Sequence, residues 1–338
     1  MPTLSIAACT QLAEQALIAS GAAPGPSAST ARALVAAEAD GQSGHGLGRL
    51  ESYSAQVRAG KIDGRAVPSV QPLSAAAVHI DAANGFAYPA LDLALEVLPQ
   101  RLADCALAIA TISRSHHIGA AGYTVERLAQ RGCIAFICSN TPSAMAFAGG
   151  VRPMMGTNPI AFAAPVPGRA PLVIDMALSQ VARSRIVAAQ KAGQPIPPQW
   201  AIDRAGQPTS DPTAALAGAL TPAGGVKGAA LALMVEILCG ALAGGHYSWE
   251  ASSFLDAHGP APAVGQVLLA LEAARLSGGG FAGRMRELCA VLGAESGVRT
   301  PGDRRLASRA RAESRGIEIS AELHATIVAL AAGAEAGK

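Results

Sequence analysis

The sequence predicts an α/β protein whose strands and helices alternate and pack in layers. Two apolar runs rich in β-branched residues, 107–112 and 134–139, are typical of buried strands, and the stretch between them, 119–131, is typical of a helix. Hydrophobic residues make up 50% of the 338 residues and charged residues 15%, which suffices for a large core. A strand-helix-strand succession of this kind favours a sheet that is covered by helices.

The remaining elements follow from the same periodicities and from their glycine and proline boundaries. Before the central unit we expect a helix at 5–20, a turn at 24–29, a helix at 31–39, a strand at 76–81 and a helix at 90–102. After it we expect strands at 159–164, 172–175 and 264–271 and helices at 181–192, 227–242, 284–292 and 321–331. A glycine-rich loop follows Asp40, and helical spacing resumes at Leu50.

Charge and composition narrow the class of partner. The 26 Lys and Arg side chains nearly balance the 24 Asp and Glu, and aromatic residues are only 4%, so neither a basic field nor a row of stacking rings is available for nucleic acid. The most apolar stretch, 228–245, is interrupted by Glu236, which favours a buried helix over a membrane span. The N-terminus has no basic segment before its apolar part. We therefore expect a cytoplasmic protein with reduced cysteines and no membrane contact.

Two familiar site patterns are weak in this chain. Residues 278–283 match GxGxxG, but the residues before them do not resemble a strand, so we interpret the match as a loop that opens a helix. The seven histidines lack the spacing of zinc ligands near cysteine, and no metal is expected.

The loop after Asp40 contains a candidate for acid–base chemistry. His45 lies between Gly44 and Gly46, which permit close approach of the backbone to a ligand, and Arg49 follows four residues later. Histidine can give or take a proton near neutral pH, and arginine can bind a carboxylate through two parallel hydrogen bonds. The pair could orient and protonate a small acid. The residues alone leave open a loop histidine with no special role.

Three other stretches have two interpretations each. Residues 113–120 follow a strand and open a helix whose N-terminus, near Gly119, could bind a phosphate of a nicotinamide dinucleotide. Residues 224–228 open another helix, and their lysine could also meet a phosphate. The sequence Gly-Thr-Asn-Pro at 156–159 is typical of a turn before a strand. All three are also consistent with plain connecting loops.

Taken together and in this order, these pieces resemble the malate/L-lactate dehydrogenase family that is unrelated to the Rossmann lactate dehydrogenases. The matching segments lie between residues 40 and 245: DGQSGHGLGRLESY, SRSHHIGAAGY, SNTPSAMAFAGGVRPMMGTNPIAFAAP, PLVIDMALSQVARSRI, DRAGQPTSDP and PAGGVKGAALALMVEILCGALAGG. The resemblance implies a three-layer α/β fold with a mixed sheet and a non-Rossmann dinucleotide-binding site. It also implies a helical domain of residues 1–75 packed with 310–338, a cofactor- and substrate-binding domain at 76–309, and homodimers.

The resemblance implies a role for each matching residue. His45 corresponds to the proton donor, with Ser43 as a neighbouring hydroxyl, and Arg49 to the arginine that binds the substrate carboxylate. Arg185 is expected beside the catalytic histidine, and further substrate contacts are expected at Thr157, Arg183 and Ser184. The expected cofactor contacts are His117, Ile118, Gly119, Ala120, Ala121, Asp175, Met176, Ala177, Val226, Lys227, Arg299, Pro301, Gly302, Arg304 and Arg305.

Two departures from the family pattern bear on the substrate. The family usually has Ser-His-Gly where this chain has Gly44-His45-Gly46, so a hydroxyl that could orient the histidine is missing. Its cyclic-imine reductases carry an aspartate at the position of Arg185, whereas its hydroxy-acid dehydrogenases usually carry a lysine there. Residues 83–91 and 244–250 nevertheless resemble the Δ1-piperideine-2-carboxylate/Δ1-pyrroline-2-carboxylate reductases.

The expected function is therefore NAD(P)H-dependent reduction of a cyclic ketimine carboxylate to L-proline or L-pipecolate. The alternatives are a 2-hydroxy-acid dehydrogenase of the malate, lactate or ureidoglycolate kind, and a degenerate member that binds cofactor with little turnover. We expect NADPH, with NADH as the alternative, because Arg299, Arg304 and Arg305 together with Arg114 offer cations to a ribose 2′-phosphate.

Overall fold

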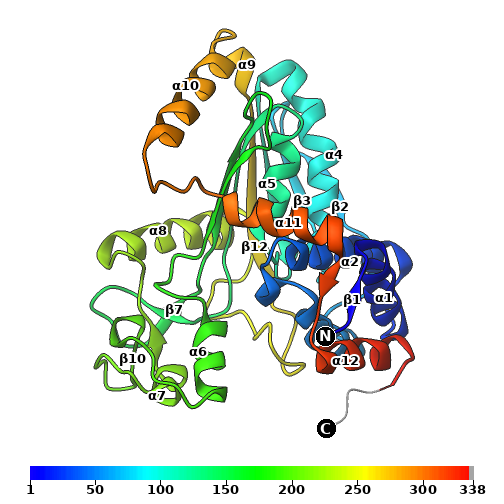
Figure 1. The fold of residues 1–338 in the computed structure, drawn as a ribbon, viewed down its shortest axis with the longest axis vertical. Coiled ribbons are helices and arrows are strands. Elements are labelled where there is room, and N and C mark those ends of the chain that lie inside the picture. The colour runs from blue at the N-terminus through cyan, green and yellow to red at the C-terminus, as the bar shows by residue number, and fades with distance from the viewer. Residues whose placement is uncertain (335–338) are drawn as a thin grey trace.

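A seven-stranded mixed sheet forms the centre of the molecule in the computed structural model, which describes residues 1–334 (Figure 1). Its strands, in spatial order, are β2 (Ser69–Pro72), β3 (Ala77–Asp81), β4 (Leu107–Ser115), β12 (Val264–Glu272), β5 (Cys133–Ser139), β8 (Ile160–Ala164) and β9 (Leu172–Met176). Only β3 and β4 are parallel, and every other neighbouring pair is antiparallel. The structure thus confirms the α/β class and the mixed sheet.

Helices cover both faces of this sheet. The helices α4 (Ala87–Cys105) and α5 (Ala121–Ala129) pack on one face, where their apolar side chains form a core with Val78, Ile112 and Leu268. The helix α8 (Val226–Glu236) and its π-helical continuation (Ile237–Leu242) pack on the other face. Because neighbouring strand residues point to opposite faces, Val267 and Leu268 of β12 enter different cores.

The two ends of the chain meet in a helical region beside the first core. This region consists of α1 (Ile6–Ala19), α2 (Pro24–Ala39), α3 (Leu50–Arg58) and α12 (Ala321–Ala331). The short strands β1 (Thr3–Leu4) and β13 (Ile317–Glu318) pair antiparallel, so the chain start lies next to α12 in Figure 1. These contacts agree with packing of the two terminal segments, and the domain boundaries at 75 and 310 stay a prediction.

A smaller four-stranded sheet, which the sequence patterns did not indicate, lies beyond the main sheet. Its strands, in spatial order, are β10 (Ala201–Ile202), β11 (Ala219–Leu220), β6 (Met145–Ala146) and β7 (Pro153–Met155). The remaining helices are α6 (Arg183–Lys191), α7 (Pro212–Ala217), α9 (Ala273–Leu276), α10 (Phe281–Ala294) and α11 (Asp303–Arg315). Within residues 1–334, no helix is long and apolar enough to cross a membrane.

Three local expectations are corrected. The turn expected at 24–29 is the first part of α2, because proline at the first helical position lacks only an N–H that would be unpaired anyway. The cofactor contacts expected at residues 299–305 were interpreted as one loop, but α11 begins at Asp303. The helix expected at 227–242 changes to π-helical geometry after Glu236. The GxGxxG match is confirmed as a helix opening, with α10 beginning at Phe281.

Candidate functional site

The strand register brings distant sequence segments to one end of the main sheet. Val264 of β12 lies opposite Ser115, so the chain leaves β4 at that end and continues into His116 and His117. Ile160 lies opposite Met176, which places the Gly-Thr-Asn-Pro turn before β8 and the end of β9 at the same end. The candidate substrate and cofactor segments therefore converge there.

One face of α3 points at the two histidines that follow β4. Arg49, Tyr53 and Gln56 are spaced four and three residues apart, which places their side chains on one side of the helix. The Tyr53 hydroxyl lies 2.7 Å from Nδ1 of His117, and the Gln56 side-chain oxygen lies 2.9 Å from Nε2 of His116. Tyr53 and Gln56 are fully buried. This wall of the site is thus closed by hydrogen bonds within the chain.

His45 is presented to this wall by a short 3₁₀ turn, Ser43–His45. Its ring stacks on that of His117, with the ring centroids 5.5 Å apart and the planes 20° from parallel. The guanidinium of Arg49 donates from Nε to the carbonyl of Gly44 at 2.8 Å and so holds the turn from the other side. The expected pair of His45 and Arg49 is therefore brought together on a single, bonded loop.

A buried carboxylate supports the chain immediately after His45. Glu38, on α2, accepts a hydrogen bond from the backbone N–H of Leu47 at 2.8 Å. A Cβ at Gly46 would lie 2.1 Å from this carboxylate, so only glycine fits there. Burial raises the pKa of Glu38, although the bond from Leu47 opposes the rise. The glycine after the histidine thus makes room for Glu38 as well as giving the backbone freedom.

Burial keeps the three clustered histidines uncharged. It lowers the pKa of His45 to about 4 and that of His116 to about 3, and the positive charge of Arg49 lowers both further. The pKa of His117 is lowered well below its usual value by the same two causes. Burial also raises the pKa of Tyr53 to about 12. At neutral pH the site therefore offers neutral imidazole and phenol groups next to one guanidinium.

This arrangement suits an anionic substrate that needs a proton. A carboxylate on Arg49 would place the adjoining carbon near His45, whose ring can donate an N–H hydrogen bond to an oxygen or nitrogen on that carbon. Neutralising Arg49 in this way removes one of the charges that lowers the pKa of His45, so substrate binding favours the acid form.

The turn at 156–158 is fixed by hydrogen bonds to two neighbouring segments. The backbone N–H of Thr157 donates to Oγ1 of Thr141 at 2.9 Å, and the buried Asn158 donates to a carboxylate oxygen of Glu236 at 2.7 Å. Asn158 has a φ of 41°, a conformation that needs such support in a residue other than glycine. Thr157 itself is half-buried at the same sheet end as His117. Its expected substrate contact is not tested by these bonds.

The first turn of α6 lies against the His45 loop. A Cβ built on Gly44 would lie 3.6 Å from Oγ of Ser184, an ordinary contact distance, so the two segments are neighbours. Arg185 is exposed, whereas Arg183 is half-buried and donates to the carbonyl of Leu216 at 3.5 Å. The structure thus places Ser184 beside the His45 loop and leaves Arg185 exposed to solvent.

At the N-terminus of α5, which is expected to meet a cofactor phosphate, one backbone N–H group is already hydrogen-bonded within the chain. Asp175, on β9, accepts a hydrogen bond from the backbone N–H of Gly122 in the first turn of α5 at 2.8 Å. Gly119 has a φ of 64°, and a Cβ there would lie 2.2 Å from the Tyr88 hydroxyl. One N–H group of this helix start is therefore paired with a carboxylate of the chain, and the expected contact with a cofactor phosphate stays a prediction.

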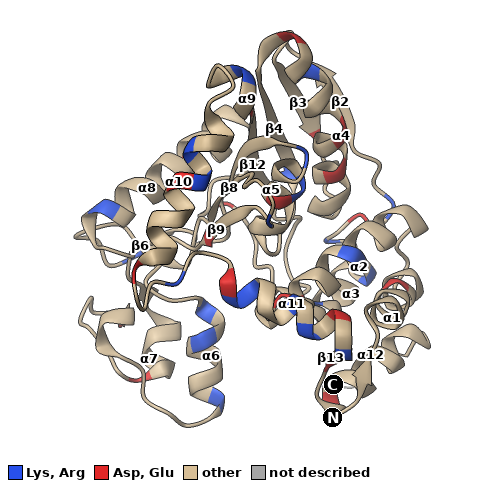
Figure 2. Ribbon diagram, turned by 45° about the horizontal axis from the view of Figure 1, so that its top comes forward, with Lys and Arg blue, Asp and Glu red and all other residues tan. Residues whose placement is uncertain are grey.

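Arg305 is also engaged within the chain. Its guanidinium donates to Asp40 at 3.0 Å and to Glu126 at 2.8 Å, and Arg309 of the same helix reaches both carboxylates. Figure 2 shows α11, which carries both arginines, lying next to α2. Although burial opposes it, the two guanidinium groups hold the pKa of Glu126 below its usual value. Arg305 is therefore held in an ion-pair cluster at the start of the loop that carries His45, and its expected contact with a 2′-phosphate stays a prediction.

Other residues expected to contact the cofactor have the exposure that this role needs. Lys227 and Val226 are exposed in the first turn of α8, and no side chain of residues 1–334 caps that helix. Gly224 and Gly225 precede it with φ of 69° and 63°, and open space surrounds the position of a Cβ at each. Met176, Arg299, Pro301 and Arg304 are exposed, and Gly302 lies beside β9. Uncapped N–H groups next to a lysine fit a dinucleotide phosphate.

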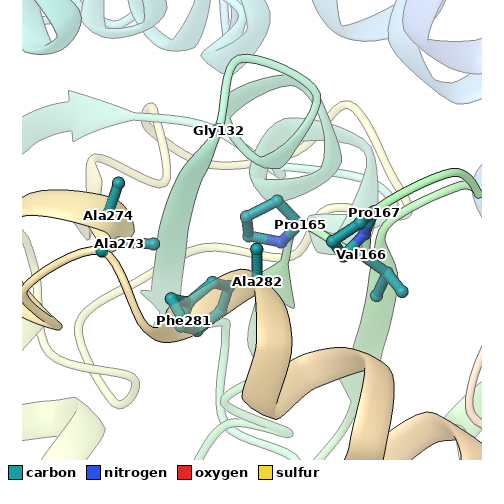
Figure 3. Close-up of a pocket in the computed structure, with 9 residues that line it drawn as sticks. Gly132, Pro165, Val166, Pro167, Ala273, Ala274, Phe281 and Ala282 are labelled. Carbon is teal, nitrogen blue, oxygen red and sulfur yellow. The ribbon is translucent and has the colours of Figure 1, made fainter.

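An apolar hollow lies at the opposite end of the sheet from the candidate site, and none of the side chains that line it can ionise. It has a volume of about 230 Å³ and is lined by apolar residues around the junction of α9 and α10, including Pro165, Val166 and Phe281 (Figure 3). Gly132 and Ala273, at its rim, adjoin the start of β5 and the end of β12, whereas His117 follows the opposite strand ends. Among residues 1–334, no group of three or more His, Cys, Asp or Glu could hold a metal.

The sequence interpretation missed several residues that shape the site. Tyr53 and Gln56 carried a usable signal, since their spacing from Arg49 places all three on one helix face. Glu126 and Arg309 carried none, because they meet across 183 residues of chain. The same holds for Phe254, whose ring centroid lies 5.1 Å from that of His117.

Comparison with known proteins agrees with this geometry. The sequence model described as malate/L-lactate dehydrogenase matches residues 4–328. The chain is 46% identical over 306 residues to the (2R)-3-sulfolactate dehydrogenase (NADP(+)) of Chromohalobacter salexigens, covering 90% of this chain and 91% of that protein. It is 40% identical to the Δ1-pyrroline-2-carboxylate/Δ1-piperideine-2-carboxylate reductase of Pseudomonas putida, covering 84% of each. The crystal structure of Δ1-piperideine-2-carboxylate reductase from Pseudomonas syringae pv. tomato superposes with a TM-score of 0.93 at 36% identity, covering 98% of this chain and 100% of that one.

Proposed function

This chain belongs to the malate/L-lactate dehydrogenase family of NAD(P)-dependent oxidoreductases, and we propose that it reduces a carbon–nitrogen or carbon–oxygen double bond next to a carboxylate. The observation that carries the proposal is the half-buried His45 on the same bonded loop as Arg49, whose positive charge a bound substrate carboxylate would offset. Arg49 binds the carboxylate, and His45 donates the proton that the new amine or alcohol needs. A bound nicotinamide supplies the hydride, and holding both groups against one carbon contributes most of the rate.

The first choice of substrate is a cyclic ketimine acid, Δ1-pyrroline-2-carboxylate or Δ1-piperideine-2-carboxylate. Relatives at 36–40% identity are named for these substrates, and so is the superposed crystal structure. The electrostatics are compatible with this substrate. The unprotonated ring nitrogen of the imine can take the proton of a protonated His45 while the adjoining carbon takes the hydride, which gives the neutral amine.

A 2-oxo acid with a second anionic group is the second candidate. The observation that favours it is the exposed Arg185 in the first turn of α6, where its neighbour Ser184 lies next to Gly44. A guanidinium there would attract a sulfonate or a second carboxylate and would repel a protonated imine. The relative at 46% identity is named for sulfolactate, which carries both a carboxylate and a sulfonate.

The cofactor of this proposal is NADPH, with NADH as the weaker substrate. Arg299 and Arg304 are exposed and could bind the 2′-phosphate, whereas Arg305 is paired with Asp40 and Glu126. Lys227 and the uncapped start of α8 would receive the pyrophosphate. The name of the sulfolactate relative includes NADP(+).

A substrate panel with both cofactors tests these proposals. Pyrroline- and piperideine-2-carboxylate are compared with pyruvate, oxaloacetate and 3-sulfopyruvate by the loss of NADPH or NADH absorbance. The proposal expects the highest kcat/KM for a cyclic imine with NADPH. Highest kcat/KM for 3-sulfopyruvate or oxaloacetate would select the second candidate. Cofactor binding without oxidation by any member of the panel would indicate a degenerate protein and contradict both.

The proposal includes a homodimer formed through α8 and α10. These helices lie on the same side of the molecule in Figures 1 and 2. Exposed apolar residues on them and on the π-helical continuation of α8 include Leu231 (40%), Ile237 (54%), Leu242 (57%) and Val291 (66%). An apolar surface of this kind is typical of a subunit interface. Light scattering on the eluted protein should give twice the chain mass, and Ile237→Glu should give the monomer mass.

A further inference from the structure

A buried lysine lies just beyond the helix that carries Arg49. The helix α3 ends with Gly60 at a φ of 72°, and the backbone N–H of Lys61 donates to the carbonyl of Gln56 at 2.9 Å. This pattern, with glycine after the last helical residue, reverses the chain direction at the helix end. It turns the lysine inward, where only 1% of its side chain is exposed.

The ammonium group of Lys61 is hydrogen-bonded to three backbone carbonyls of one loop, residues 253–258. Its Nζ donates to the carbonyls of Ser253 at 2.7 Å, Asp256 at 3.0 Å and His258 at 2.6 Å. The Asp256 carboxylate lies 3.7 Å away and is half-exposed. A buried cation is costly unless its donors are all used, so the three carbonyls and the lysine require each other.

This loop closes the histidine wall. Phe254 is the only buried residue between positions 251 and 260. Its carbonyl accepts from the Gln56 side chain at 2.9 Å, and its ring centroid lies 5.0 Å from that of His116 and 5.1 Å from that of His117. The His117 ring in turn stacks on His45. Lys61 and Gln56 thus fix the aromatic ring that backs the proposed proton donor.

We propose that Lys61 is a positioning residue for the reaction, and this rests on the proposed function. Its ammonium holds residues 253–258 so that Phe254 stays packed on the two histidines. Water is thereby kept from the buried side of His117, and His117 keeps His45 in place. Lys61 itself touches neither the proposed substrate carboxylate nor the proton donor, so it acts only through the loop.

The test compares Lys61→Met with Phe254→Leu and with the double variant, and Lys191→Met on the exposed end of α6 is the matched control. Lys61→Met should lower kcat by roughly 10–100-fold, the cost of a misplacement of about 1 Å, while the KM for the cofactor stays within about twofold. Phe254→Leu should lower kcat similarly, and the double variant should be no worse than the lower single variant, because both changes remove the same packing. Lys191→Met should match the wild type.

Three kinetic results would overturn the proposal. One is a folded Lys61→Met protein, shown by a wild-type-like circular dichroism spectrum, that retains wild-type kcat. The second is a folded Phe254→Leu protein with wild-type kcat, which tests the idea even when the lysine variant does not fold. Additive losses in the double variant would also contradict it, since the lysine would then act by another route.

A readout without substrate separates this proposal from the proposed function. In Lys61→Met, the NMR ring resonances of His116 and His117 should shift, because Phe254 leaves them, and residues 251–258 should exchange amide hydrogens faster. If the wild type turns over no substrate but these changes occur, the function fails and the loop attachment stands. If turnover is present but the histidine resonances are unchanged, the positioning role fails.

Discussion

The two walls of the candidate site differ in how far their polar groups are already satisfied. On the wall made by α3 and the end of β4, Tyr53, Gln56 and His117 are buried and bonded within the chain. At the starts of α6 and α8, Arg185 and Lys227 are exposed, and within residues 1–334 no side chain caps either helix. The first wall is therefore a preorganised chemical surface, and the second offers cations and N–H groups to a ligand.

This difference separates chemistry from recognition. Groups that transfer or orient a proton need fixed positions and shifted pKa values, which burial and internal bonds supply. Groups that bind a charged substrate or cofactor must be free until the ligand arrives. Substitutions on the first wall should therefore change kcat or stability, and those on the second should change affinity and substrate choice.

The largest expected effect is that of removing His45 from the first wall. His45→Asn should lower kcat by roughly 10²–10⁴-fold, the usual cost of a lost general acid, because an amide cannot deliver a proton. Cofactor affinity, measured by fluorescence titration, should stay unchanged. His324→Asn, on α12, is the control and should keep wild-type kcat. A His45→Asn enzyme with wild-type kcat would remove the histidine from the mechanism.

The next comparison concerns two adjacent arginines of α11. Arg305→Ala should lower the free energy of unfolding by about 3 kcal/mol, since it leaves Asp40 and Glu126 buried with one cation fewer. Arg304→Ala should change stability by less than about 0.5 kcal/mol, because Arg304 is exposed, and should weaken NADPH binding while sparing NADH. Urea unfolding and cofactor titration measure the two effects. Equal destabilisation by both changes would contradict the assignment.

Arg49→Lys should mainly weaken substrate binding. Lysine keeps the charge but loses the two-pronged geometry, and such charged pairs contribute roughly 1.5–3 kcal/mol, which is a rise in KM of about 10–150-fold. The change also removes the Nε bond to Gly44, so a smaller loss of kcat is expected. The test measures kcat and KM of the wild type and of Arg49→Lys for the substrate and for its carboxamide analogue. Equal kinetics of wild type on both compounds would show that no carboxylate is bound there.

The buried histidines should make the protein less stable in acid. The folded-state pKa of His116 is about 3, below its value of 6.5 when unfolded, so only the unfolded chain gains this proton between those pH values. Stability from this group is complete above pH 6.5 and falls as pH drops toward 3. His116→Gln should reduce the pH slope of the unfolding free energy by about 1.4 kcal/mol per pH unit. An unchanged slope between about pH 6 and 4 would contradict the burial argument.

The smallest expected effects come from the contact between the His45 loop and the first turn of α6. Gly44 does not have a positive φ, and a Cβ there meets Ser184 at ordinary contact distance, so Gly44→Ser should fold normally. Its hydroxyl should raise kcat by less than about 10-fold by orienting His45.

Arg185→Asp places a carboxylate in the first turn of α6, where the helix dipole favours it. It should raise imine reduction and lower reduction of dianionic oxo acids; loss of both activities would contradict the imine assignment.

Local pattern in the sequence was sufficient for several features of this protein. The strands at 107–112 and 134–139 and the helix at 321–331 follow from short apolar periodicities, and the structure contains all three. The His45 loop was identified for a local reason too, because two glycines around a histidine with an arginine one turn later are visible in six residues, 44–49. Such signals can be recognised in the sequence alone because they depend on residues that are close together in the chain.

Only the tertiary structure decided which charged groups are free. Arg304 and Arg305 are adjacent in the sequence, but one is exposed and the other meets Glu126 across 179 residues. Asp175 caps α5 across 53 residues, and Lys61 reaches the loop of Phe254 across more than 190. Ion pairs and buried hydrogen bonds depend on which elements the sheet order brings together, and no local periodicity encodes that order. Candidate residues for the chemistry could therefore be named from the sequence, whereas their partners required the fold.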